Sequence, residues 1–495
     1  MRDRKISYVL SRAQSQVSVT SNRRFWLFSL FLGIMTQLTG CYIFEPKEPN
    51  SEKAKNVILF IGDGMGVSTV TAARIFDGQS KGMEGEEHLL SFETFPNLAL
   101  VKTYNTNQQV PDSAGTATAM VTGQKTRAGV INIGPEVLRG DCEASKAHEL
   151  KSIGRFVKER GKALGVVTTT TITHATPATI YSVSPERNWE SDQYMPAQAI
   201  ADGCVDIAQQ LLALDSDNGP DITLGGGRSM FFGKEDGGVR IAGGQMSDWL
   251  ARNPARFYIQ KKSELLEIAG KDQVIGLFSP SHMTFVAERG EKTLEPTLRE
   301  MTKAAITYLE DKGDGYFLMV EGGRIDHAHH QNRAGFAMLE TQEFSRAIEV
   351  AIRETDPSNT LILVTADHSH VMTMAGYPTK GNDILGHVIG NDWRGLANDS
   401  PDLDLNGTPY TTLGYANGPG AVSVLPRPNP EAGVSATIQA LIPTGYVFDG
   451  EGFAVETHAG EDVALYGTGP GSEMVRGVME QNKVFDVIIS AFGWE

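Results

Sequence analysis

The chain has 495 residues, 40% of them hydrophobic, which is enough to bury a large core in one extended domain or in about three smaller ones. Its 60 acidic and 44 basic residues give a formal net charge of −16, and no basic run stands out, which argues against a nucleic-acid partner. The excess of carboxylates instead suggests that many of them hold cations, which reverse the local sign of the charge.

The N-terminal residues are typical of an export signal. Two arginines precede the apolar run Phe25–Leu38, which is too short to cross a bilayer comfortably as a helix. The run ends in Leu38-Thr39-Gly40-Cys41, which resembles the lipobox of bacterial lipoproteins, where the cysteine is acylated. This resemblance implies a signal peptide over residues 1–40 and a lipoprotein anchored at Cys41 in the periplasm or at the cell surface. A plain secretory signal with an incidental cysteine and twin-arginine export are the alternatives.

After a polar tether over residues 42–54, short apolar runs alternate with helical patterns. The runs predicted as strands are Asn56–Ile61, Ala163–Thr168, Tyr316–Val320 and Thr360–Val364. The segments with helical periodicity are Ser68–Phe76, Glu149–Arg160, Pro296–Glu310 and Arg333–Arg353. Strands that are apolar along their whole length are typical of a sheet that helices bury on both faces. We therefore expect an α/β fold, a three-layer sandwich around a mostly parallel central sheet.

One long stretch of the chain departs from this alternation. Residues 376–452 are rich in Gly, Pro, Asn and Asp and lack clear periodicity over most of their length. We interpret them as a small lobe inserted into a single domain that spans residues 55–495. No internal repeat or low-complexity tract is evident in the sequence.

The predicted domain contains two cysteines, Cys142 and Cys204. In an oxidising compartment an even pair favours a disulfide. Two buried thiols are the alternative that the residues alone leave open.

Three of the predicted strands run directly into acidic residues. The segments are Ile61-Gly62-Asp63-Gly64, Val320-Glu321-Gly322-Gly323-Arg324-Ile325-Asp326 and Val364-Thr365-Ala366-Asp367-His368-Ser369-His370. Because sites in open α/β sheets lie beyond the carboxyl ends of the strands, we expect these acids to converge. A single acid after a strand is usually a turn former or a helix cap. Three together predict a site, and their mutual repulsion requires cations.

The ligand types at these positions favour zinc. Asp326 and His330 are four residues apart, so one helical turn would place them on the same face. His368 directly follows an aspartate, and His458 stands in a separate segment further along the chain. Mixed Asp/His ligation suits Zn²⁺, whereas an all-oxygen set suits Mg²⁺.

Ser113, in Pro111-Asp112-Ser113-Ala114-Gly115-Thr116-Ala117, is the candidate nucleophile. Small residues at a helix start would let the backbone approach an anion, and a helix N-terminus favours negative charge. The segment does not fit the Gly-x-Ser-x-Gly pattern, so this hydroxyl would need a metal to lower its pKa. An ordinary Ser N-cap before an Ala-rich helix is the alternative.

Taken together, these segments resemble the alkaline phosphatase family over most of the chain, from about Lys55 to Phe485. Asp-Gly-Met-Gly, Pro-Asp-Ser-Ala, Val-Glu-Gly-Gly-Arg-Ile-Asp-His, Thr-Ala-Asp-His-Ser-His and Thr-His-Ala-Gly-Glu-Asp-Val-Ala follow one another in the family's order. The resemblance implies hydrolysis of small phosphate monoesters through a phosphoserine at Ser113, with release of inorganic phosphate. It also implies two Zn²⁺ and one Mg²⁺ per subunit and a homodimer.

The resemblance also implies a role for each site residue. The implied ligands are Asp326, His330 and His458 for the first zinc, Asp367, His368 and Asp63 for the second, and Asp63, Glu321 and Thr176 for the magnesium. Arg187 matches the arginine that forks two phosphate oxygens, which makes it the second catalytic residue beside Ser113. Asp112 matches the acid that steadies this arginine.

The sequence is more similar to the animal branch of the family than to its best-known bacterial members. His174 and His327 occupy positions where those bacterial enzymes have Asp and Lys, and they would line the site. Cys142 and Cys204 match a cystine pair of the animal branch, and the predicted lobe matches its crown.

One departure from the animal branch concerns a further calcium site. Ser279 stands where an acidic ligand would be expected, although Glu295 could still serve. The resemblance therefore leaves this fourth metal site doubtful.

Three other functions compete with a monoesterase. Sulfatases need C/S-x-P-x-R, and the residues after Ser113 lack both the Pro and the Arg. A phosphodiesterase of the same superfamily is closer, but a diester has only two free nonbridging oxygens, so the Arg187 fork would be redundant. A tethered protein that only binds phosphate or metal would need no serine beside the ligands.

Overall fold

The computed structural model describes residues 53–242, 245–421, 430–448 and 451–494. The predicted signal peptide, Cys41 and almost all of the predicted tether lie outside the described residues. Across the described ranges we find no helix that combines the length and the apolar character needed to span a membrane.

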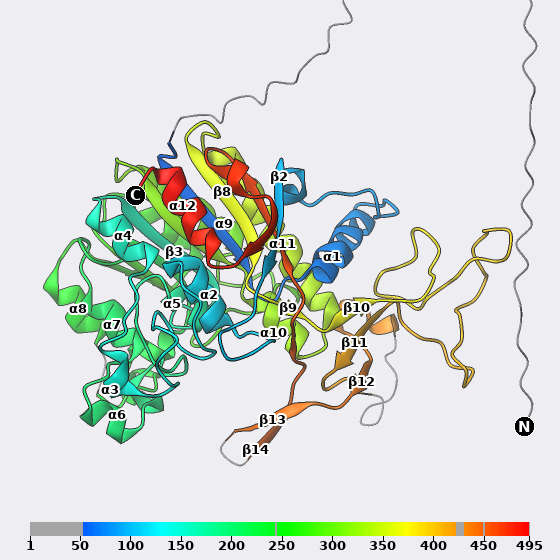
Figure 1. Ribbon diagram of the computed structural model, residues 1–495, viewed down its shortest axis with the longest axis horizontal. Helices are drawn as coiled ribbons and strands as arrows, with labels where there is room; N and C mark the ends of the chain where they lie inside the picture. Colours follow the sequence, from blue (N-terminus) through cyan, green and yellow to red (C-terminus); the bar gives the residue numbers. More distant parts are fainter. Residues whose placement is uncertain (1–52, 243–244, 422–429, 449–450, 495) are drawn as a thin grey trace, which may run out of the picture. The chain divides into compact units, whose positions relative to one another are not determined.

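Within the described residues a ten-stranded sheet forms the centre of the domain (Figure 1). In spatial order its strands are β17 (Gly477–Glu480), β2 (Asn97–Lys102), β16 (Val463–Thr468), β8 (Thr360–Ala366), β1 (Asn56–Gly62), β7 (Tyr316–Glu321), β3 (Ala163–Thr171), β4 (Ile222–Gly226), β6 (Val274–Leu277) and β5 (Phe257–Ile259). From β8 to β5 every neighbouring pair is parallel. Only β16 runs antiparallel to its neighbours, β8 and β2. The sheet is thus mostly parallel, as predicted.

Helices cover both faces of this sheet. One layer consists of α1 (Val67–Ser80), α9 (Leu298–Glu310) and α11 (Ala334–Glu354), and the other of α2 (Ser113–Thr122), α4 (Ile153–Glu159) and α12 (Lys483–Phe492). Every residue of β1 is buried, because α11 and α12 both contact this strand. A fully apolar strand is what this environment requires, and the three-layer α/β sandwich is confirmed.

Two predicted helix boundaries were wrong, because α1 continues to Ser80 instead of ending at Phe76 and α4 begins after its predicted start. Shorter helices occupy the connections. They are α3 (Cys142–Ser145), α5 (Ala175–Ala178), α6 (Ala197–Ala201), α7 (Ile207–Ala213), α8 (Met246–Arg252) and α10 (Arg324–His330). The helix expected from Glu149 begins only at Ile153, because Glu149 forms a β-bridge with Ile133. By contrast α9 begins close to its predicted start, since Thr297 and Glu300 form a capping box there.

The register at the sheet centre sets the position of the site. Ile61, near the end of β1, lies opposite Glu321 of β7 and opposite Thr365 of β8. The residues that follow these three strands therefore emerge side by side at one edge. Asp63, Glu321 and Asp367 are the acids at that edge.

Between β8 and β16 the chain leaves the main sheet and forms small sheets of its own. One contains β10 (Met372–Met374), β11 (Leu413–Asn417) and β12 (Ala440–Ile442), and β13 (Gly445–Phe448) pairs with β14 (Glu451–Ala454). Except for β10, which lies just before it, and the end of β14, these strands lie where the sequence predicts an inserted lobe, and the bounds 376–452 remain a prediction. We call residues 372–454 the lobe below.

Cys142 and Cys204 form a disulfide, with 5.9 Å between their Cα atoms. The bond joins α3 to the segment just after α6 and closes a loop with a sequence separation of 62 residues. A loop of this length corresponds to about 4 kcal/mol of stabilisation in the chain-entropy description. The predicted disulfide is confirmed in preference to two free thiols.

Candidate active site

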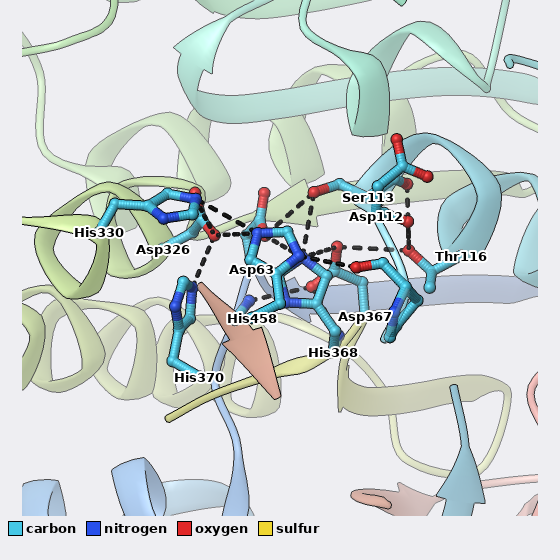
Figure 2. A network of polar contacts seen from close by, with 12 residues as sticks. Asp63, Asp112, Ser113, Thr116, Asp326, His330, Asp367, His368, His370 and His458 are labelled. Atoms are coloured by element: carbon cyan, nitrogen blue, oxygen red, sulfur yellow. Dashed lines mark hydrogen bonds and ion pairs between the residues drawn. The ribbon is translucent and has the colours of Figure 1, made fainter. Parts of the chain in front are cut away.

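The predicted ligands gather at the carboxyl edge of the parallel strands, where most of them are buried. Asp63 follows β1, Glu321 ends β7, Asp367 follows β8, and Thr176 lies on α5 after β3. These four side chains have no exposed surface. Figure 2 shows Asp63, Asp367 and the site histidines pointing toward one another.

A first cluster contains Asp326, His330 and His458. Asp326 Oδ1 lies 3.4 Å from the Nε2 atoms of both His330 and His458, which are 3.2 Å from each other. The opposite ring nitrogens, both Nδ1, donate to backbone carbonyls, at 2.6 Å to Glu456 and at 2.8 Å to Pro111. A proton on each Nδ1 leaves a bare lone pair on each Nε2. Two lone pairs facing each other beside a carboxylate are the donor set of a zinc site.

A second cluster surrounds the candidate nucleophile. His368 Nε2 lies 3.3 Å from Asp367 Oδ2, 3.4 Å from Asp63 Oδ1 and 3.2 Å from Ser113 Oγ. The Ser113 hydroxyl also lies 3.5 Å from Asp63 Oδ1. Asp367 is oriented by the backbone N–H of Gly64, which donates to its Oδ1 at 3.0 Å. The hydroxyl therefore stands among three groups that fit one cation.

A third cluster is recognised by polar atoms that lack partners. Asp63 Oδ2, Glu321 Oε1, Thr176 Oγ1 and His174 Nδ1 are buried and have no hydrogen-bond partner among the described residues. Unpaired buried polar atoms are costly, and groups of them indicate an ion or water. Three of the four are oxygens, which suit a hard cation such as Mg²⁺. Asp63 thus contributes one oxygen to the second cluster and the other to the third.

Ser113 is the first residue of α2, and the residue before it is the helix cap. The Asp112 side chain accepts from the backbone N–H of Gly115 at 3.1 Å. The alternative in which Ser113 itself caps the helix is therefore wrong. Ser113 Oγ is free to face the cluster, at a helix N-terminus that favours an anion.

Arg187 is held at the rim of the site by two residues. Its Nη1 donates to Asp112 Oδ2 at 3.1 Å, and its Nη2 donates to His174 Nε2 at 3.2 Å. Its backbone N–H donates to the carbonyl of Gly129, whose own N–H donates to Asp112 Oδ2. Asp112 thus fixes both the helix that carries Ser113 and the guanidinium.

His327 lies on α10 and belongs to a group of three histidines at this edge. Its Nδ1 accepts from Arg324 Nη1 at 2.8 Å, and its ring centroid lies 5.7 Å from that of His174 and 4.4 Å from that of His282. His282 was not singled out in the sequence. Its Nδ1 accepts from the backbone N–H of Thr171 at 3.1 Å.

The metal-free cluster is electrostatically unfavourable. Burial, reinforced by the carboxylates of Asp367 and Asp326, raises the pKa of Asp63 well above its usual value. Burial likewise raises the pKa of Glu321 to about 7, although the Thr168 and Thr170 hydroxyls donate to it. Carboxylates in this state take up protons unless cations replace them, so the cluster fits metal ions.

Sequence reasoning missed two residues beside the first cluster. His370 Nε2 lies 2.7 Å from Asp326 Oδ1, and its Nδ1 is hydrogen-bonded to the Glu456 carboxylate. Burial alone would lower the pKa of His370, but Glu456 and Asp326 raise it to about 10. The His-Ser-His alternation after β8 was the available signal for His370. Glu456 had none.

Polar contacts from β11 join the lobe to this region. Tyr415 of β11 is hydrogen-bonded to His329 at 2.8 Å, and the His329 ring lies 4.9 Å from that of His370. Asn417, at the end of β11, accepts from the backbone N–H of Thr457 at 3.0 Å. The segment that carries His458 is thus fastened to the lobe.

Comparison with known proteins identifies the family. The alkaline phosphatase family model matches residues 54–493. The chain belongs to the alkaline phosphatase family. It is therefore a phosphoric monoester hydrolase by family, as the sequence predicted, and members of this family normally bind metal ions.

The animal alkaline phosphatases are similar to this chain over most of their length. The tissue-nonspecific isozyme of Gallus gallus is 44% identical over 459 residues, which cover 88% of this chain and 84% of the chicken protein. The tissue-nonspecific isozyme of Homo sapiens is 41% identical over 477 residues, which cover 92% of this chain and 87% of the human protein.

Solved bacterial alkaline phosphatases share the fold. The structure from the Antarctic bacterium TAB5 matches with a TM-score of 0.61 at 22% identity, covering 90% of this chain and 100% of that one. The Thermus thermophilus enzyme gives a TM-score of 0.65 at 23% identity, and the match covers 90% of this chain and 93% of the Thermus chain.

Proposed function

We propose that this alkaline phosphatase hydrolyses phosphate monoesters through a phosphoserine formed on Ser113. The observation that carries the proposal is the position of Ser113 Oγ, 3.2 Å from His368 Nε2 and 3.5 Å from Asp63 Oδ1, at the N-terminus of α2. A protein that only bound phosphate or metal would need no hydroxyl there. A nucleophile placed inside the ligand set supports turnover.

The proposal includes two zinc ions and one magnesium ion per chain. The residues that would hold them are Asp326, His330 and His458 for the first zinc, Asp63, Asp367 and His368 for the second, and Asp63, Glu321 and Thr176 for the magnesium. The lone pairs on His330 and His458 and the unpartnered oxygens around Asp63 support this assignment. When bound, the two zinc ions would lower the pKa of the Ser113 hydroxyl and stabilise charge on the departing oxygen.

The residues of the chain position the substrate and carry the covalent step. Ser113 Oγ attacks phosphorus in line with the ester oxygen, the P–O bond to the alcohol breaks, and the hydroxyl proton of Ser113 passes through water to the departing alcohol oxygen. A water molecule then attacks the phosphoserine, which releases inorganic phosphate and restores the hydroxyl. Arg187, fixed by Asp112 and His174, can hold two nonbridging oxygens with its planar fork. Such a reaction depends mainly on positioning and charge stabilisation.

A calcium site is not part of the proposal. Glu295, the acid left for it, accepts from the Thr284 hydroxyl at 2.8 Å and from the Thr284 N–H at 2.9 Å. Arg289 Nη2 also lies 4.0 Å from the Glu295 carboxylate. A guanidinium already provides positive charge there, and Ser279 supplies no negative charge.

Arg187 is the residue proposed to give monoesters their advantage over diesters. We expect Arg187→Ala to slow monoester turnover about 10²–10³-fold, a loss of roughly 3–4 kcal/mol that is typical of one preorganised charge donor. A diester has a substituent on one of the oxygens that the fork would hold, so its weak turnover should change far less. The measurement is kcat/KM for one aryl phosphate and its methyl diester, at equal zinc content and with a chelator control.

A matched control is available on the surface. Arg155 is exposed and lies 4.0 Å from Glu149, so Arg155→Ala should leave both rates unchanged. Inorganic phosphate should inhibit Arg187→Ala less than the wild type, because the product uses the same two hydrogen bonds. Equal losses on the two substrates would contradict a role in monoester selectivity and would mean that Arg187 only holds the site together.

We further propose that the protein is a lipoprotein, anchored at Cys41 in the periplasm or at the cell surface after removal of residues 1–40. Family resemblance also supports a homodimer. Tyr377, Trp393 and Leu405 of the lobe are large exposed apolar side chains, which are suited to a protein contact.

The lipid anchor is tested by Cys41→Ser in the full precursor. Two anchoring signals or a diacyl group are needed for stable membrane attachment, and acylation at Cys41 would provide the latter. The wild type should sediment with membranes through a high-salt wash, whereas the variant should move to the soluble fraction. A variant that stays on the membrane after that wash would rule out the lipobox interpretation.

A further inference from the structure

We propose that Glu456 is a positioning residue that orients the ligands of the first zinc site. The inference rests on the proposed function, because it concerns zinc at Asp326, His330 and His458. It adds a residue that is neither a predicted ligand nor a contact of the substrate. Glu456 lies just before β15 (His458–Ala459) and has no exposed surface.

The side chain of Glu456 acts on Asp326 through one intermediate. Its Oε2 is hydrogen-bonded to His370 Nδ1, and the other nitrogen of that ring lies 2.7 Å from Asp326 Oδ1. The imidazole is therefore held at both nitrogens between two carboxylates. A ring fixed in this way fixes the rotamer of Asp326, as outer partners of metal ligands commonly do.

The backbone of Glu456 acts on His330. Its carbonyl accepts from His330 Nδ1 at 2.6 Å, and its N–H donates to the His330 carbonyl at 2.9 Å. The first contact keeps the proton on Nδ1 and leaves Nε2 as the atom that faces His458. Glu456 thus contacts His330 directly and Asp326 through His370, and it lies two positions before the third ligand.

The same contacts argue against Glu456 as a direct zinc ligand. Its Oε2 is taken by His370, and its Oε1 accepts from the backbone N–H of Val371 at 2.8 Å. Both oxygens are therefore occupied within the chain. A buried carboxylate is costly unless each of its oxygens is paired. The hydrogen bond from His370 connects the Glu456 carboxylate to the predicted ligand Asp326, which explains why a buried acid stands at position 456.

Glu456→Gln tests the side-chain route, since an amide cannot accept from both His370 Nδ1 and the Val371 N–H. We expect the dissociation constant of the first zinc to rise 10–100-fold, the usual effect of losing such a partner, with the second zinc nearly unaffected. The probe is Zn²⁺ alone, titrated into metal-stripped full-length protein against a chromophoric chelator. Activity should return at high zinc, with the half-activating concentration shifted by the same factor.

Two further variants complete the test. Glu461→Gln is the matched control, because this exposed acid of the same segment accepts from Ser369 at 2.6 Å and touches none of the predicted ligands. It should leave both zinc affinities unchanged. His370→Gln should weaken the first zinc as Glu456→Gln does, and the double variant should show little additional loss, since both changes break one chain of contacts.

The possible outcomes separate the two proposals. Wild-type protein that binds no zinc would overturn the proposed function. This inference alone would be overturned if the wild type bound two zinc ions and the zinc dissociation constants of Glu456→Gln lay within twofold of the wild-type values at both sites. Equal weakening of the two zinc sites, or losses that add in the double variant, would also overturn it. Melting of the metal-free proteins at the same temperature shows that the variants fold.

Discussion

Replacing Ser113 with alanine should lower phosphate monoester turnover by about 10³-fold or more and abolish any covalent phosphoenzyme. The hydroxyl is the only side-chain group proposed to form a bond to phosphorus, so its loss removes the two-step route. Zinc content should stay near the wild-type value, because Asp63, Asp367 and His368 remain. The measurements are kcat/KM on an aryl phosphate, acid-quenched labelling with phosphate, and metal analysis of the same sample.

The control for this variant lies on the same helix. Thr122→Ala changes the last turn of α2, where the hydroxyl donates to the carbonyls of Thr118 and Gln124 and accepts from the Gln124 N–H, and should leave the rate within a few fold. A covalent phosphate recovered from Ser113→Ala would exclude Ser113 as the nucleophile. A large loss of zinc would instead make the hydroxyl a required ligand.

Removing the metal ions should destabilise the fold, and the effect should grow with pH. Each ion bound only to the native state stabilises it by about 4 kcal/mol when present at 1,000 times its dissociation constant. Without ions, burial raises the folded-state pKa of Glu321 from 4.5 to about 7. A raised acid pKa contributes stability at low pH that is lost as pH rises, here between about 4.5 and 7. The chelated protein should therefore lose stability across this window, whereas the loaded protein should not.

Thermal melting of loaded, stripped and reloaded protein at pH 5, 6, 7 and 8 measures this effect. Reloading with zinc and magnesium should restore the original melting temperature, which separates metal loss from irreversible damage. Equal melting temperatures before and after verified metal removal would contradict a shared site for these acids. If the difference in melting temperature between loaded and stripped protein did not increase with pH, the raised pKa of Glu321 in the folded state would be contradicted.

The centre of the fold was predictable because each of its strands contains a continuous apolar run. β1, β3, β7 and β8 are buried on both faces, and only a few sequence patterns satisfy that condition. The outer strands carry a weaker signal. β16 alternates buried and half-buried residues, and β2 exposes Leu98 and Leu100, so neither stands out from a loop.

In the site, what could be predicted depended on distance along the chain. Asp63, Asp367 and His368 follow strands directly, so topology alone brings them together. His370 and Glu456 meet only because β9 (Ser369–His370) pairs with β15, over a separation of 86 residues. No local pattern encodes that pairing. The functions of Arg187 and Thr176 came from family resemblance, and the geometry agrees with it without testing it.

The two oxygens of Asp63 face different clusters, so binding of a metal ion at one proposed site would affect binding at the other. Oδ1 lies beside His368 and Ser113, whereas Oδ2 is buried without a partner near Glu321 and Thr176. A cation on either oxygen displaces the proton that burial would otherwise favour on this carboxylate. The first ion to bind thus delivers an ionised ligand to the second, and each must raise the affinity of the other by the same factor. If the proposed zinc and magnesium ions bind here, we expect their loading to be cooperative, with partly loaded chains a minority at intermediate metal concentrations.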